Sequence, residues 1–168
     1  TALYTFGLYS LFLTQNIFAV SSIRTISLLR SARIVSFIVM IVVFFFLVDV
    51  IVSVRLPFYL IPALIFLVVF MLNIQSFWSY SASRGINKEI ILYSLFNSLV
   101  IYELSLILLT WPVDVTIYSI FLTGIFYAYS GLSHTWFEGR LFKGVLWEYV
   151  WVGFLSMIIL FSFSKWGF

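Results

Sequence analysis

Two carboxylates lie inside otherwise apolar segments, and they are the side chains of this sequence best placed to do chemistry. Asp49 comes fifteen residues after the start of the apolar run 34–54, and Glu103 thirteen after the start of the run 90–111. A helix rises 1.5 Å per residue, so we expect both carboxylates at a similar depth, about 20 Å from the start of their helices. Such a pair suits a proton or cation site, or an acid–base centre.

The same carboxylates also fit a structural role. A charge at the centre of a bilayer costs about 2.5–3.5 kcal/mol on insertion scales, and less toward the interface. Asp49 and Glu103 are therefore expected to face protein, water or a partner, and the long side chain of Arg55 can extend toward either of them. An ion-coupling site, a structural ion pair, a contact with a partner and a catalytic pair all remain open.

A second group of polar residues is expected in the other half of the apolar runs. It comprises Gln15, Asn16, Asn73, Gln75, Asn97 and Glu148. Amides form hydrogen bonds between transmembrane helices, each contributing about 0.6 to 2 kcal/mol. The alternative is a cavity lined by amides, including a lipid-binding site. Asn73 and Gln75 are about 200° apart on a helix, so they cannot both face one cavity.

The most polar connection contains the one histidine of the chain. It runs from His134 to Arg140 and includes Glu138. These three residues are candidates for a site in this connection, in which His134 beside Glu138 could act as an acid or a base. No neighbouring residues supply a nucleophile, a base and an orienting group together, so we assign no catalytic residue. With one histidine and no cysteine, we expect no metal site and no cofactor.

The composition indicates the class of protein. Of the 168 residues, 64% are hydrophobic and 9% are charged, whereas soluble domains have roughly 45–50% apolar and about 25% charged residues. So few charges cannot cover the surface of a soluble fold, and disorder requires the opposite composition. We therefore predict an integral membrane protein whose solvent is the lipid bilayer. The basic residues are scattered, so we expect no nucleic acid as a partner.

Six apolar runs have about the length of a transmembrane helix. They cover residues 3–20, 34–54, 57–80, 90–111, 116–133 and 145–164. A helix needs about 20 residues to cross the hydrocarbon layer, and none of the runs alternates as a barrel strand would. The prediction is an all-α bundle of about six spans with short loops, forming a single domain over residues 1–168. In the fifth run, Gly124, Ala128 and Gly131 form a stripe of small residues that predicts a close helix contact.

Basic residues are concentrated in alternate connections. The first, third and fifth connections hold seven of the nine Lys and Arg, the second holds Arg55, and the fourth holds none. By the positive-inside rule, the basic connections are cytoplasmic, or face the matrix or stroma in an organelle. Both ends of this sequence are then expected on the outer side.

The C-terminal region resembles the end of some uncharacterised small polytopic bacterial membrane proteins. The resemblance rests on His134-Thr-Trp-Phe-Glu-Gly-Arg-Leu-Phe-Lys143, on Val145-Leu-Trp-Glu-Tyr149, and on an apolar run that ends in Ser164-Lys-Trp166. It implies a protein of the bacterial inner membrane and carries no known function.

Several classes of function remain open at this point. The leading interpretation is a non-catalytic structural or accessory subunit, acting by helix–helix contacts with other membrane subunits or with copies of itself. One alternative is a small transporter, a channel or a membrane substrate-binding subunit, in which Asp49 and Glu103 couple protons or cations. A further alternative is an intramembrane enzyme.

Overall fold

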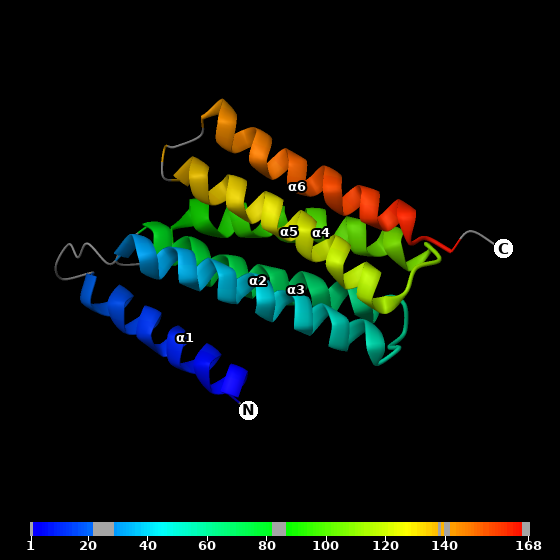
Figure 1. The fold of residues 1–168 in the computed structure, drawn as a ribbon, viewed down its shortest axis with the longest axis horizontal. Helices are drawn as coiled ribbons and strands as arrows, with labels where there is room; N and C mark the ends of the chain where they lie inside the picture. The colour runs from blue at the N-terminus through cyan, green and yellow to red at the C-terminus, as the bar shows by residue number, and fades with distance from the viewer. Residues whose placement is uncertain (1, 22–28, 82–86, 138, 140–141, 166–168) are drawn as a thin grey trace.

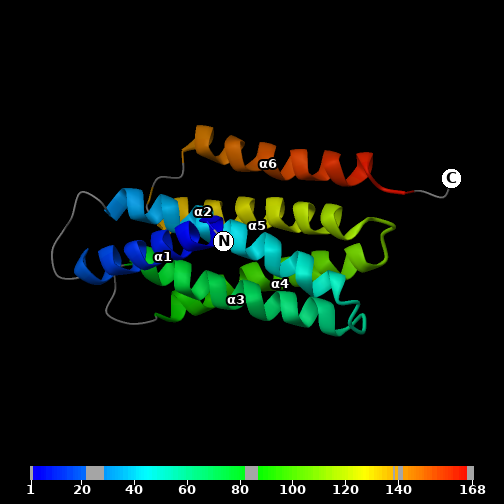
Figure 2. The same ribbon diagram turned by 60° about the horizontal axis from the view of Figure 1, so that its bottom comes forward.

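In a computed structural model the chain is a bundle of long helices (Figures 1 and 2). The structure describes residues 2–21, 29–81, 87–137, 139 and 142–165. Within these ranges there are six helices and no strand, which confirms the predicted all-α class. The helices are α1 (Ala2–Ser21), α2 (Leu29–Ser53), α3 (Leu60–Ser81), α4 (Lys88–Leu109), α5 (Val115–Phe137) and α6 (Lys143–Ser162).

Five of the described helices, α2 to α6, are long and apolar enough to cross a membrane. The most hydrophobic is α2, whose most apolar stretch, within Ala32–Ser53, has a mean hydropathy of 3.1. A helix of 20 residues is about 30 Å long, which is the thickness of the hydrocarbon layer. Helix α1 coincides with the predicted first span, and its crossing of the membrane remains a prediction.

The bundle has two ends of different character. We call the end formed by the C-termini of α1, α3 and α5 and the N-termini of α2, α4 and α6 the basic end, because the sequence around its connections carries seven Lys and Arg. At the opposite end the connections are short. Arg55, two residues after the end of α2, adopts a φ of 54°, and Pro112, which has no N–H to extend a helix, lies three residues after the end of α4.

Helix α5 lies at the centre of the bundle. It contacts α2, α3, α4 and α6, whereas α1 and α6 lie along opposite edges in Figure 1. In the most apolar stretch of α5, 44% of the residues are buried, whereas in the corresponding stretch of α6 only 11% are buried. Side chains projecting from α5 therefore meet protein in most directions, while those of α6 mostly face outward.

The apolar core lies between α2, α3, α4 and α5. The rings of Phe44 and Phe126 lie with their centroids 4.3 Å apart, and Val48, Ile65 and Ile101 are fully buried in the same cluster. In a bilayer the lipid tails are as apolar as such side chains, so helices of this kind associate there through close packing and not through the hydrophobic effect.

The small residues of α5 provide the contact with α6. A Cβ added at Gly124 would lie 1.8 Å from Oγ of Ser156, and one added at Gly131 would lie 2.2 Å from the ring of Tyr149. Ala128, between them, is buried. The predicted close contact is thus confirmed, and α6 is the helix that makes it.

Candidate functional site

Polar side chains from three helices meet inside the half of the bundle that is nearer the basic end. We call this set the polar network. It comprises Asn73 and Ser76 of α3, Asn97 of α4, and Ser130, Ser133 and His134 of α5. Every member lies within a helix that is apolar enough to cross a membrane.

Hydrogen bonds connect the polar network across the helix interfaces. Oγ of Ser130 donates to Oδ1 of Asn73 over 3.0 Å, and Oγ of Ser76 lies 2.9 Å from Nε2 of His134. Nδ2 of Asn97 donates to Oγ of Ser133 over 3.2 Å. The positions 73 and 76 on α3, and 130 and 134 on α5, are three and four residues apart, which places each pair on one helix face. Both faces turn toward each other, so the network fixes α3 and α4 to α5.

His134 lies inside α5 and not in the connection where we expected it. The fifth helix continues to Phe137, four residues beyond the predicted span. The imidazole is 4% exposed and has Phe37 of α2 and Phe77 of α3 edge-on to it, with centroid distances of 5.0 and 5.2 Å. Aromatic packing and the Ser76 hydrogen bond offset part of the cost of burying the ring.

The Ser76–His134 pair has the separation of a nucleophile and its base. The same separation also serves a hydrogen bond that holds two helices together, and the Asn73–Ser130 and Asn97–Ser133 pairs repeat that arrangement beside it. Among the described residues, no three His, Asp or Glu side chains are grouped closely enough to hold a metal ion. The geometry therefore fits helix association first.

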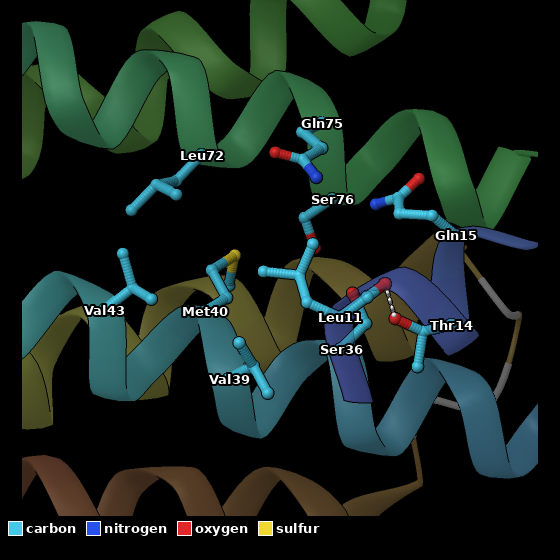
Figure 3. A pocket seen from close by; sticks show the side chains of 10 residues that line it. All are labelled: Leu11, Thr14, Gln15, Ser36, Val39, Met40, Val43, Leu72, Gln75 and Ser76. Carbon is cyan, nitrogen blue, oxygen red and sulfur yellow. Dashed lines mark hydrogen bonds between the residues drawn. The ribbon is translucent and has the colours of Figure 1, made fainter. Parts of the chain in front are cut away.

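A cavity of about 220 Å³ lies beyond Ser76, between α1, α2 and α3 (Figure 3). Its lining consists of Leu11, Thr14, Gln15, Ser36, Val39, Met40, Val43, Leu72, Gln75 and Ser76. Ser76 thus belongs both to the cavity wall and to the polar network. Gln75 faces the cavity while Asn73 bonds to α5, as expected from their angular separation on the helix.

In the described part of the chain, no hydrogen bond joins the carboxyl groups of Asp49 and Glu103. Asp49 is partly buried, and its Oδ1 accepts a 3.4 Å hydrogen bond from Ser119 of α5. Glu103 is exposed on α4. Arg55 is exposed in the turn after α2 and forms an ion pair with neither carboxylate.

The other candidates from the sequence are dispersed. Gln15 lines the cavity, the neighbouring Asn16 is exposed on α1, and Glu148 is exposed on α6. Glu138 and Arg140 lie outside the described residues. Ser76 and Ser130 are not among the candidates predicted from the sequence. Their spacing from Asn73 and His134, three and four residues along one helix face, is the signal that would have indicated them.

Fold and composition together define a multi-pass helical bundle suited to a membrane. The chain belongs to the family described as "Protein of unknown function (DUF5656)", whose profile matches residues 5–163. No curated protein and no solved structure matches the chain. The resemblance of the C-terminal region to bacterial inner-membrane proteins remains a prediction.

Proposed function

We propose that this chain is a non-catalytic subunit of a membrane assembly, and that it binds a transmembrane helix of another subunit through α4. The observation that supports this function is the exposed carboxylate of Glu103, which lies on an otherwise apolar helix surface well inside the predicted span.

The surface around Glu103 has the spacing of a helix–helix seam. Leu92, Phe96, Leu99 and Glu103 are all exposed and are separated by four, three and four residues. We call these four residues the α4 face. Apolar residues at alternating spacings of three and four form the seam of paired helices, so a partner helix can lie along the whole α4 face.

The opposite side of α4 is already occupied by its own bundle. Ser94, Ser98 and Ser105 are fully buried there, and such small residues allow the backbones of neighbouring helices to approach closely. Packing within the bundle therefore accounts for the inner side of α4. It does not account for a carboxylate on the outer side.

Energetics favour a partner over lipid at the α4 face. An acidic residue in a helix centre costs about 2.5–3.5 kcal/mol on insertion scales when lipid surrounds it. A partner helix with a Lys, an Arg or an amide at the depth of Glu103 offsets that cost by a charge-assisted hydrogen bond. The expected occupant is thus a helix of another protein with one such donor.

The distribution of basic residues supports an orientation for the assembly. The positive-inside rule puts the basic end on the cytoplasmic side of a bacterial inner membrane, or on the matrix or stroma side in an organelle. Both ends of the described chain then lie on the outer side, and Glu103 lies in the outer half of α4.

Site-specific crosslinking in native membranes tests the proposed function. The chain has no cysteine, so one introduced cysteine is a unique attachment point for a photo-crosslinker. Phe96→Cys reports on the α4 face, and Leu67→Cys is the control on α3, where Leu67 is also exposed. We expect one product with another protein from Phe96→Cys and none from Leu67→Cys.

Changes at Glu103 test what specifies the contact. Adding Glu103→Leu should remove the crosslinked product, while Glu103→Gln, which retains a hydrogen-bonding group, should keep part of it. Equal products from both cysteine positions, or products containing only two copies of this chain, would contradict the proposal.

If the chain is a transporter, measurements of ion flux with the same Glu103 variants should give a different result. It requires Asp49 and Glu103 to lie along one ion path, and we expect the purified chain in vesicles to show no proton or cation flux. A flux that Glu103→Gln abolishes would establish transport and overturn the subunit proposal.

A further inference from the structure

We propose that the cavity between α1, α2 and α3 binds the head group of a neutral glycerolipid of the diacylglycerol type. This inference does not depend on the α4 face. It rests on the polarity, the charge, the depth and the size of the cavity.

Polarity changes along the cavity in one direction. Thr14, Gln15, Ser36, Gln75 and Ser76 supply its polar groups, and Leu11, Val39, Met40, Val43 and Leu72 its apolar ones. On each of the three helices, the polar residues lie nearer the basic end and the apolar residues nearer the middle of the bundle. Figure 3 shows Gln15 at one end of the cavity, Val43 and Leu72 at the other, and Gln75 beside Ser76 between them. A ligand that fits is amphipathic and lies along the membrane normal.

Among the described residues that line the cavity, none has a charged side chain, and Arg33, one turn before Ser36 on α2, is not part of the lining. A phosphate or carboxylate would lose its hydration there without a cation among these lining residues to pair with it, and this cost is large for a charge without a partner. Hydroxyl and ester groups are different, because amides and hydroxyls can both donate to them and accept from them. The head group is therefore uncharged and carries hydroxyl or ester oxygens.

The polar end of the cavity lies below the level of the phosphate groups. Gln15 and Gln75 are each six residues from the basic-end terminus of their helix, a distance of about 9 Å. Only a small uncharged head group can reach this depth without carrying a phosphate into the apolar layer. Diacylglycerol has such a head group.

The size of the cavity suits a head group and not a whole lipid. A volume of about 220 Å³ equals that of about seven water molecules in the liquid. Pockets that enclose a drug-sized ligand have about 300–1,000 Å³. The cavity thus has room for a glycerol unit with its first ester group, while the acyl chains extend along the outer surfaces of the helices.

Ser76 connects this cavity to the interior of the bundle. Its Oγ lies 2.9 Å from Nε2 of His134, and a hydroxyl has one donor and two acceptor positions. Ser76 therefore retains hydrogen-bonding capacity toward a ligand while the bond to His134 holds it in place.

Photolabelling of the purified full-length chain tests this inference. The protein is placed in phosphatidylcholine nanodiscs that contain a diacylglycerol with a photoreactive group at the start of one acyl chain. We expect labels on α1, α2 and α3 at the cavity, and competition by unlabelled diacylglycerol but not by phosphatidylglycerol. Labels spread over the exposed side of α6, or equal competition by both lipids, would overturn the proposal.

Two variants and a matched control make the result specific. Gln75→Leu removes one exposed amide and should weaken diacylglycerol binding about fivefold, as expected for one lost hydrogen bond. Val39→Phe fills the cavity and should abolish labelling. Asn16→Leu removes the amide next to Gln15 that is outside the lining, and it should bind like the unchanged chain. Unchanged labelling of both Gln75→Leu and Val39→Phe would contradict the site.

Discussion

The polar network and the α4 face both carry polar groups on apolar helices, but they differ in how those groups are placed. In the polar network, His134, Ser130 and Asn73 are buried and hydrogen-bonded to neighbouring helices. On the α4 face, Glu103 is exposed, and no hydrogen bond within the described chain satisfies it. The three residues of the first region each have a hydrogen-bond partner on another helix, although Nδ2 of Asn73 is buried without one, whereas Glu103 has no such partner in the described chain.

This difference distinguishes residues that stabilise the fold from residues that can bind another helix. A polar side chain that meets its partner inside the bundle contributes to folding, because its alternative is an unsatisfied group in hydrocarbon. A polar side chain that faces outward does not stabilise the isolated bundle, but it can form a hydrogen bond with a partner helix that binds there. Substitutions are therefore expected to change the free energy of unfolding most in the interior of the bundle and least on its surface.

Replacing the buried imidazole should have the largest effect. We expect His134→Ala to lower the free energy of unfolding by about 3 kcal/mol, because it leaves a cavity between Phe37 and Phe77 and removes the partner of Ser76. Denaturation in mixed micelles measures this loss. Asn16→Ala is the control, since Asn16 is an exposed polar residue. A loss below about 1 kcal/mol would show that the polar network does not stabilise the fold.

Adding one methyl group to α5 should have the next largest effect. A Cβ at Gly124 would lie 2.9 Å from Cβ of Ser156, which cannot rotate away, so the two helices must separate. We expect Gly124→Ala to reduce the free energy of unfolding by about 2 kcal/mol through overpacking. In the matched variant Gly153→Ala the nearest atom is 3.9 Å away, and no loss is expected. Equal stability of the two variants would contradict the close α5–α6 contact.

The exposed carboxylate should have the smallest effect on the isolated chain. We expect Glu103→Leu to change the free energy of unfolding in micelles by no more than about 0.5 kcal/mol, because Glu103 is exposed to the detergent in the folded and in the denatured state, and the cost of that exposure cancels between them. The same micelle denaturation measures this value on the purified protein. A loss comparable with that of His134→Ala would place Glu103 among the residues that hold the bundle together, and the comparison between the two regions would fail.

Several features of the fold could be predicted because they follow from local composition. The all-α class, the positions of the helices and the stripe from Gly124 to Gly131 depend on runs of apolar or small residues that are contiguous or periodic in the sequence. The end of α5 was predicted too early, at residue 133. His134 is a polar residue, and its burial depends on Phe37 and Phe77, which lie far away in the sequence.

The surroundings of the candidate site residues could be predicted less well, because they depend on the tertiary structure. Asp49 and Glu103 have a similar depth in the sequence pattern, but helix rotation turns Asp49 toward Ser119 of α5 and leaves Glu103 on the surface. Depth along a helix follows from counting residues, whereas direction depends on which helices are neighbours.

By itself, the sequence determined that this chain forms helices apolar enough for a lipid solvent, with basic residues concentrated in alternate connections. These properties depend on composition and on the length of each run, and a bilayer imposes them on any chain with such a pattern. Only the tertiary structure decided that Ser76 meets His134, that a cavity opens beside them, and that Glu103 faces outward. Those contacts arise from the packing order and rotation of the helices, which depend on how side chains distant in sequence fit together.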